Sequence, residues 1–112
     1  MLASDVINRA RVILRDENTP YRWSDVSLLL WLNDGQREIV LERPDALFDS
    51  DADLKTLTEA TATTDELTLE DSWRTPLMDY ICFMAFQQDS DDTANQQRAT
   101  SHYQLFQQGI VR

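Results

Sequence analysis

The side chains of this sequence that are best suited to chemistry are Cys82 and His102, its only thiol and its only imidazole. A cysteine beside a histidine is the arrangement of many nucleophilic enzymes. Cys82, however, lies in the most apolar run of the chain, where burial raises the pKa of a thiol and makes it inert. His102 lies among aromatic positions, and we interpret it as a core or interface histidine hydrogen-bonded to a carboxylate, with Asp79 as the candidate. We therefore predict no catalytic pair.

Three alternating carboxylates, Asp49, Asp51 and Asp53, have the spacing that opens a calcium-binding loop. Such a loop needs glycine at its sixth position and glutamate at its twelfth, and this sequence has Leu54 and Ala60 there. We interpret the run as a solvated loop. The two glycines of the chain cannot form a phosphate-binding loop. We expect no enzyme activity, no cofactor and no metal.

The composition predicts one helical domain spanning residues 1–112. A chain of 112 residues with 42% apolar residues has room for a single core. Two glycines and three prolines favour long helices over a turn-rich β fold. One cysteine excludes an intrachain disulfide and fits a reducing compartment. The sequence has neither a signal peptide nor an apolar stretch of membrane-spanning length, so we expect no membrane association.

The charge of the chain is distributed unevenly. Residues 1–44 hold six arginines and seven acids, whereas residues 45–92 hold thirteen acids and two bases, a local net charge of −11. The total of −10 repels nucleic acid, so we expect no sequence-specific binding of DNA. Nine of the ten basic residues are arginine, which suits forked ion pairs at interfaces.

The helices that would position these residues are predicted from helix-capping residues and from the spacing of apolar residues. Ser4 is expected to cap a first helix that ends before residues 16–20. Ser24 is expected to cap a second, which contains Gly35 and which Pro44 ends. Glycine inside a helix costs about 1 kcal/mol relative to alanine, so we expect the backbone of a neighbouring element to pack closely at Gly35.

The remaining segments complete a mainly α fold, a small four-helix bundle with an inserted β-hairpin arm between the second and third helices. The arm covers about residues 45–74, because 66–70 alternates with the period of a strand. Its slight apolar content predicts that it is mobile. A third helix is expected to start at Pro76 behind a Thr75 cap, and it is apolar nearly all round. A fourth follows the acidic run 89–92 and ends at Gly109, before a tail at 109–112.

The order of these segments resembles a family of tailed-phage head–tail adaptor (connector) proteins. The likeness covers roughly residues 4–108 and is weakest over 46–66. It is carried by Arg22-Trp23-Ser24-Asp25, by residues 32–40, by Arg43-Pro44-Asp45-Ala46, by the run from Trp73 through Thr75-Pro76-Leu77 and Asp79-Tyr80 to Ala85-Phe86, and by residues 89–95 followed by Arg98-Ala99, His102-Tyr103 and Phe106.

This resemblance implies a structural virion protein made in the host bacterial cytoplasm. Copies, usually twelve, would form a ring under the portal protein, continue its DNA channel and join it to a tail, stopper or nozzle protein. DNA would pass through this channel without specific binding. Together with the charge pattern, this places Arg9, Arg11, Arg15, Arg37, Arg43, Ile110, Val111 and Arg112 at a subunit or portal interface. It places Asp49, Asp51, Asp53, Leu57, Glu59, Asp65, Glu66 and Glu70 on an arm that faces the lumen, the adjacent subunit or the tail.

The acidic segment also supports a different class of function. A small acidic regulator or nucleic-acid mimic would use its carboxylates to occupy a basic site on another protein. This alternative function predicts a stable monomer or dimer that binds a basic partner and does not bind the portal.

Overall fold

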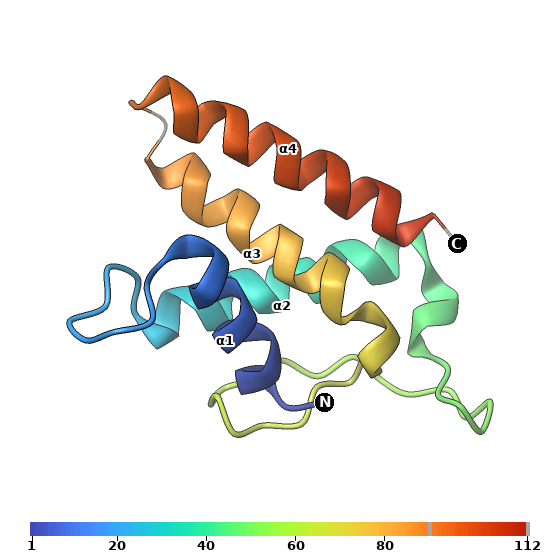
Figure 1. The fold of residues 1–112 in the computed structure, drawn as a ribbon. Helices are drawn as coiled ribbons and strands as arrows, with labels where there is room; N and C mark the ends of the chain where they lie inside the picture. The colour runs from blue at the N-terminus through green and yellow to red at the C-terminus, as the bar shows by residue number, and fades with distance from the viewer. Residues whose placement is uncertain (90, 112) are drawn as a thin grey trace.

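The structure, a computed structural model, describes residues 1–89 and 91–111 and is mainly helical (Figure 1). Its α-helices are α1 (Ala3–Leu14), α2 (Asp25–Glu42), α3 (Arg74–Gln88) and α4 (Thr93–Ile110). Short 3₁₀ turns span Pro44–Leu47 and Asp71–Trp73. The expectation of four helices in a mainly α fold is confirmed.

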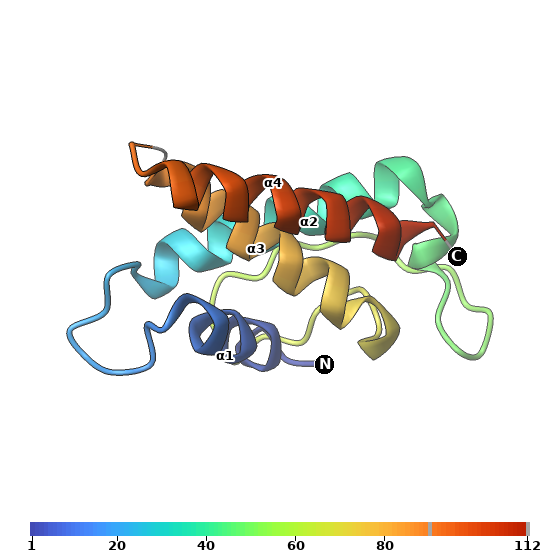
Figure 2. The same cartoon turned by 45° about the horizontal axis from the view of Figure 1, so that its top comes forward.

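Helix α3 lies at the centre of the molecule and packs against α1, α2 and α4 (Figures 1 and 2). Its apolar circumference is explained by this position, since three helices cover it. The core around it is formed by fully buried side chains from three helices: Ile7, Leu28, Leu32, Ile39, Leu77, Ile81 and Cys82. The molecule measures 43 × 28 × 16 Å, so it is long and thin.

Two predicted helix starts are confirmed and two are wrong. The Ser24 hydroxyl accepts the Ser27 N–H at 3.1 Å, and Asp92 caps α4 by accepting the Ala94 N–H at 2.8 Å. Helix α1 begins one residue before Ser4, because the Asp5 carboxylate accepts the Leu2 N–H at 2.8 Å and closes the first turn. Helix α3 begins at Arg74, so Pro76 lies in the first turn, where its missing N–H leaves no hydrogen bond unmade.

Both glycines lie where a neighbouring side chain approaches the helix closely. A Cβ atom at Gly35 would lie 3.1–3.3 Å from the Tyr80 side chain, so the closest neighbour is a side chain and not the backbone that we expected. A Cβ at Gly109 would lie 2.8 Å from Cγ of Pro76. We expected Gly109 to end the fourth helix, but α4 continues to Ile110. The small size of Gly109 instead allows α4 to approach the start of α3.

The β-hairpin arm is not present in the part of the chain that the structure describes. That part contains only two isolated β-bridges, Leu2 with Glu66 and Phe48 with Leu54. The second half of the segment, residues 60–70, forms an extended strap across the start of α1. The N–H groups of Ala3 and Ser4 donate to the carbonyls of Asp65 and Thr63 at 2.9 and 2.8 Å.

The strap is also packed into the core, which corrects the expectation of a mobile arm. Leu67 and Leu69 are 5% and 1% exposed. Asn33 of α2 holds Ala60 at both its backbone groups, donating to the carbonyl at 2.8 Å and accepting the N–H at 2.9 Å. The alternating pattern of 66–70 therefore reflects every second side chain facing helices, without a paired strand.

Candidate functional site

The loop between α1 and α2 is organised by a buried ion pair. The Arg11 guanidinium donates to Asp16 at 2.7 Å, to the Trp23 carbonyl at 3.0 Å and to Asp25 at 2.8 Å. The Asp16 carboxylate in turn accepts the N–H groups of Arg22 and Trp23 at 2.7 and 3.2 Å. Arg11 is only 3% exposed. It is therefore not available to a neighbouring subunit, and we correct its assignment to the interface.

This network positions one wall of a groove of about 570 Å³, which we call the basic groove. The other wall comes from the end of α3 and the start of α4. Charged lining residues are Arg15, Arg22, Arg98 and Asp89, and the remaining lining residues are Ile13, Leu14, Trp23, Phe86, Asn95 and His102. Three arginines and one aspartate line the groove, although the protein as a whole has a net charge of −10.

The arginines of the basic groove are differently engaged. Arg22 forms an ion pair with Asp89 and lies over the Trp23 ring, 5.0 Å from its centroid. Arg98 donates to Asn95 at 2.8 Å and lies 5.9 Å from the centroid of Phe86. Within the described residues, neither Arg15 nor Arg98 forms an ion pair with an acid. Two cationic side chains of the groove therefore remain open to an external anion.

His102 forms part of the floor of the basic groove and contacts Asp79, as predicted. Its Nδ1 lies 3.0 Å from the Asp79 carboxylate, and its ring stacks on Phe86 with centroids 5.7 Å apart. Cys82 is fully buried, and burial raises the pKa of its thiol to about 12, with the charge of Asp79 adding to the effect. At neutral pH this thiol is protonated, so it cannot serve as a nucleophile.

Residues 48–54 form a compact turn at the far end of the molecule, which we call the acidic loop. The Asp49 carboxylate accepts the N–H groups of Asp51 and Asp53, each at 2.9 Å. Phe48 and Leu54 are bridged at the base of the loop and are 50% and 66% exposed. Figures 1 and 2 show this green loop at the opposite end from the loop between α1 and α2.

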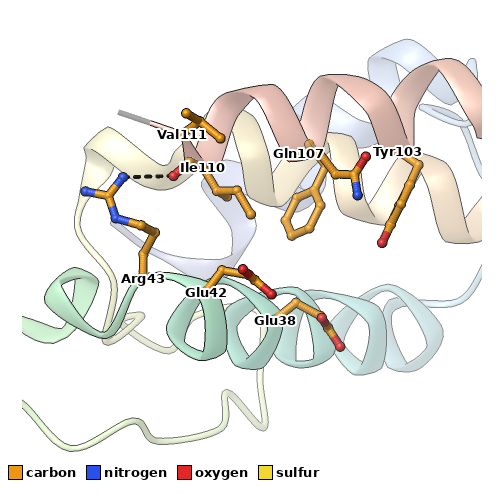
Figure 3. Close-up of a pocket in the computed structure, with 8 residues that line it drawn as sticks. Glu38, Glu42, Arg43, Tyr103, Gln107, Ile110 and Val111 are labelled. Carbon is orange, nitrogen blue, oxygen red and sulfur yellow. Dashed lines mark hydrogen bonds between the residues drawn. The ribbon is translucent and has the colours of Figure 1, made fainter.

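A second groove, of about 430 Å³, lies between α2 and α4 at the end of the chain (Figure 3). The Glu38 and Glu42 side chains of α2 lie along one side of it. Arg43 donates to the Ile110 carbonyl at 2.9 Å and holds Asp45 with two further hydrogen bonds at 2.9 and 2.8 Å. Arg43 thereby ties the end of α4 to the end of α2.

The other predicted interface residues fall into distinct environments. Arg9 and Arg15 are exposed on and just after α1, and Arg37 is exposed but paired with Asp34 and Glu59. Ile110 ends α4, is 7% exposed and belongs to the core, so its assignment to the tail and to the subunit or portal interface is corrected. Val111 is 80% exposed, and Arg112 lies outside the described residues.

The predicted arm residues do not form one surface. Asp51, Asp53 and Glu59 are exposed, whereas Leu57 is half-buried. Asp65 closes a turn of the strap, and hydrogen bonds from the Thr61 and Ala62 N–H groups and the Thr61 hydroxyl lower its pKa. The remaining two carboxylates bind within the chain: Glu66 accepts from the Met1 amino group, and Glu70 accepts from the Ser50 N–H, both at 3.0 Å.

Sequence reasoning did not assign Arg22 and Arg98 to a site, although both line the basic groove. One local signal was available, since Asn95, Arg98 and His102 recur at spacings of three and four and so share one face of α4. No local signal placed that face beside Arg15 and Arg22, because the packing of the loop between α1 and α2 brings them together.

Within residues 1–89 and 91–111, no three His, Cys, Asp or Glu side chains are grouped as a metal site would require. No described helix combines the length and the apolarity needed to cross a membrane. The comparisons with protein-family models, curated proteins and solved structures found no match to this chain.

Proposed function

We propose that this chain is a structural subunit of the head–tail junction of a tailed phage, made in the bacterial cytoplasm and assembled into the virion. Its copies form a ring, expected to be a dodecamer, which lies beneath the portal, extends the DNA channel and joins a tail protein. The observation that carries this proposal is the ordered resemblance over roughly residues 4–108.

The residues that carry the resemblance also hold this fold together. Asp25 accepts from Arg11 at the start of α2, and Arg43 pairs with Asp45 at its end. Asp79 contacts His102 between α3 and α4. A likeness that falls on the contacts between helices concerns the whole fold, which supports membership of the same structural class more than a single shared motif would.

The charge of the chain suits a channel through which DNA passes. Exposed carboxylates repel phosphates, so an acidic wall would not retain the genome. Glu38 and Glu42 of α2 are exposed and available for this role. No arginine-rich surface is needed for such a function, because the channel must let DNA slide.

We also propose a portal contact at the C-terminal tail. Ile110 is part of the core, so within this tail only the residues after it can dock without unfolding α4. Removing residues 111–112 should weaken binding to the portal and leave the free energy of unfolding unchanged. Equal portal affinity of the full-length and trimmed proteins would exclude this contact.

Electron microscopy of the purified protein, alone and mixed with its portal, tests the proposed function. Rings, or an added layer on the portal rim, would support it. Separate subunits that leave the portal bare would contradict it. In that case a pull-down with basic proteins would test the alternative function, a small acidic regulator or nucleic-acid mimic. Such a protein must present its carboxylates to a basic partner.

A further inference from the structure

We propose that the acidic loop of one copy binds in the basic groove of the next copy, so that subunits join head to tail. This contact rests on the proposed function of a ring subunit and identifies the surfaces that would form the ring. The occupant of the groove is a second copy of this chain, and the ligand is an acidic turn with an apolar base.

Charge complementarity is the first observation that favours this pairing. In the groove, Arg15 and Arg98 form no ion pair within the described chain, although the protein carries twice as many acids as bases. In the loop, the side chains of Asp51 and Asp53 are exposed and bind no other described side chain. Two open cations at one end therefore match two open carboxylates at the other.

The apolar parts of the two surfaces also match. Phe48 and Leu54 flank the acids of the loop and are largely exposed, which is unfavourable in an isolated monomer. The groove is also lined by the half-buried side chains of Trp23 and Phe86, over which Arg22 and Arg98 lie. An aromatic anchor surrounded by charge pairs is the usual composition of the centre of a protein interface.

The loop is organised for binding before it meets a partner. The Asp49 carboxylate fixes the backbone of Asp51 and Asp53, and backbone hydrogen bonds join Asp49 to Asp53 and Lys55 to Leu47 at 3.0 and 2.9 Å. A turn held in this way loses little conformational entropy on binding, so more of the contact energy contributes to affinity.

The positions of the two surfaces make the contact head to tail. The basic groove is lined by the loop between α1 and α2, the end of α3 and the start of α4, and Figures 1 and 2 show these segments at the opposite end of the molecule from the green loop 48–54. Because the loop and the groove are different surfaces, each bound copy leaves one of each free for further subunits. Such a heterologous contact produces a ring when the rotation between subunits closes.

Reversing the charge on either side tests the contact. In sedimentation experiments, Arg15→Glu/Arg98→Glu and Asp51→Arg/Asp53→Arg should each weaken self-association by about a hundredfold, since like charges placed together cost several kcal/mol. An equimolar mixture of the two variants should recover association, because each pairing then joins opposite charges. Gln104→Glu/Gln108→Glu, which adds two negative charges at exposed positions of α4 outside the groove, should associate like the natural protein.

A disulfide trap locates the contact in the assembled ring. Copies with Ala52→Cys and copies with Asn95→Cys, mixed on the portal and oxidised, should form a disulfide between loop and groove, whereas Cys82 is buried and stays reduced. Rings that form without this disulfide and resist both charge reversals would overturn the contact and leave the proposed function standing. Failure of the natural protein to form any ring or oligomer would overturn both.

Discussion

Arg11 and Asp16 place opposite charges in the interior of a small protein. The Arg11 side chain is 4% exposed and the Asp16 side chain 7%. Burial of ions is costly unless each is paired and hydrogen-bonded, and here the pair is completed by two backbone N–H groups, one carbonyl and Asp25. The arrangement fixes the conformation of the loop that carries Arg22 and Trp23.

Replacing Arg11 by methionine should therefore destabilise the protein strongly. Asp16 would keep its buried charge without a cation to pair with, a change that typically costs roughly 3–5 kcal/mol. Urea unfolding followed by circular dichroism measures this loss. Arg9→Met, a change of the same chemistry on the exposed side of α1, should cost almost nothing. Equal stability of the two variants would show that the buried pair does not hold the loop.

The thiol of Cys82 should be unreactive in the folded protein. Burial raises its pKa to about 12, so at pH 8 almost none of it is thiolate. A colorimetric thiol reagent should label it slowly in buffer and fully, within minutes, in denaturant. Rapid labelling of the folded protein would place Cys82 in an accessible environment and reopen a chemical role.

Among the elements, the strap 60–70 differs most from what its sequence suggested. It contributes Leu67 and Leu69 to the core and supplies the acceptors for the first N–H groups of α1. It therefore stabilises the fold as a structural part of the domain. If residues 54–70 were a mobile arm, their removal would leave the fold intact. Because the strap is part of the core, we expect this deletion to unfold the protein.

Leu69→Ala should lower the free energy of unfolding by about 2–5 kcal/mol, as expected for a large side chain truncated in a packed core. Leu54→Ala, at a position that is 66% exposed, serves as the matched control and should leave stability nearly unchanged. Chemical denaturation measures both. If Leu69→Ala lowered the free energy of unfolding only slightly, the segment would be a mobile arm and not part of the core.

The turn of the strap at Asp65 should make stability sensitive to acid. The pKa of Asp65 is lowered below its ordinary value of 3.8 by three hydrogen bonds, so the folded state favours the charged carboxylate. The resulting stabilisation is present above the pKa of the unfolded chain and is lost as the pH falls through the folded value. Asp65→Ala should then be less stable than the natural protein at pH 6, with a difference that narrows towards pH 3. Asp51→Ala, whose side chain makes no such bonds, should show no pH-dependent difference.

The sequence predicted elements whose signals are local. Ser24 and Asp92 marked helix starts, and the single pairing proposed across the chain, Asp79 with His102, is present. The strap and the basic groove were missed for a common reason. Residues 63–67 contact the start of α1, and Arg15 and Arg22 line the same groove as Arg98, through packing between distant segments that no short-range pattern records.

For the whole molecule, the central feature is that the two ends of its long axis carry opposite charges. The segments that line the basic groove, with its open arginines, lie at one end of the ribbon in Figure 1, and the acidic loop, with its open carboxylates, lies at the other. The total charge of −10 opposes association between copies, while the two ends attract each other at short range. Assembly is therefore expected to depend on how far each of these effects is screened.

Raising salt should separate the two effects. At low salt the general repulsion between acidic copies acts over long distances, and at 0.1 M it is screened beyond about 10 Å. Self-association should strengthen as salt first rises and weaken at about 1 M, where the contacts between loop and groove are also screened. Light scattering across a salt series measures this. If self-association kept increasing up to about 1 M salt, the interface between copies would be mainly apolar.

The hydrogen bonds between the strap and α1 constrain the order in which the chain can fold during synthesis. The carbonyls of Thr63 and Asp65 complete the first turn of α1, so a ribosome must translate some sixty further residues before that turn is complete. Contacts of such long sequence separation slow folding. The start of α1 should consequently be among the last parts to become protected from solvent exchange as the nascent chain emerges.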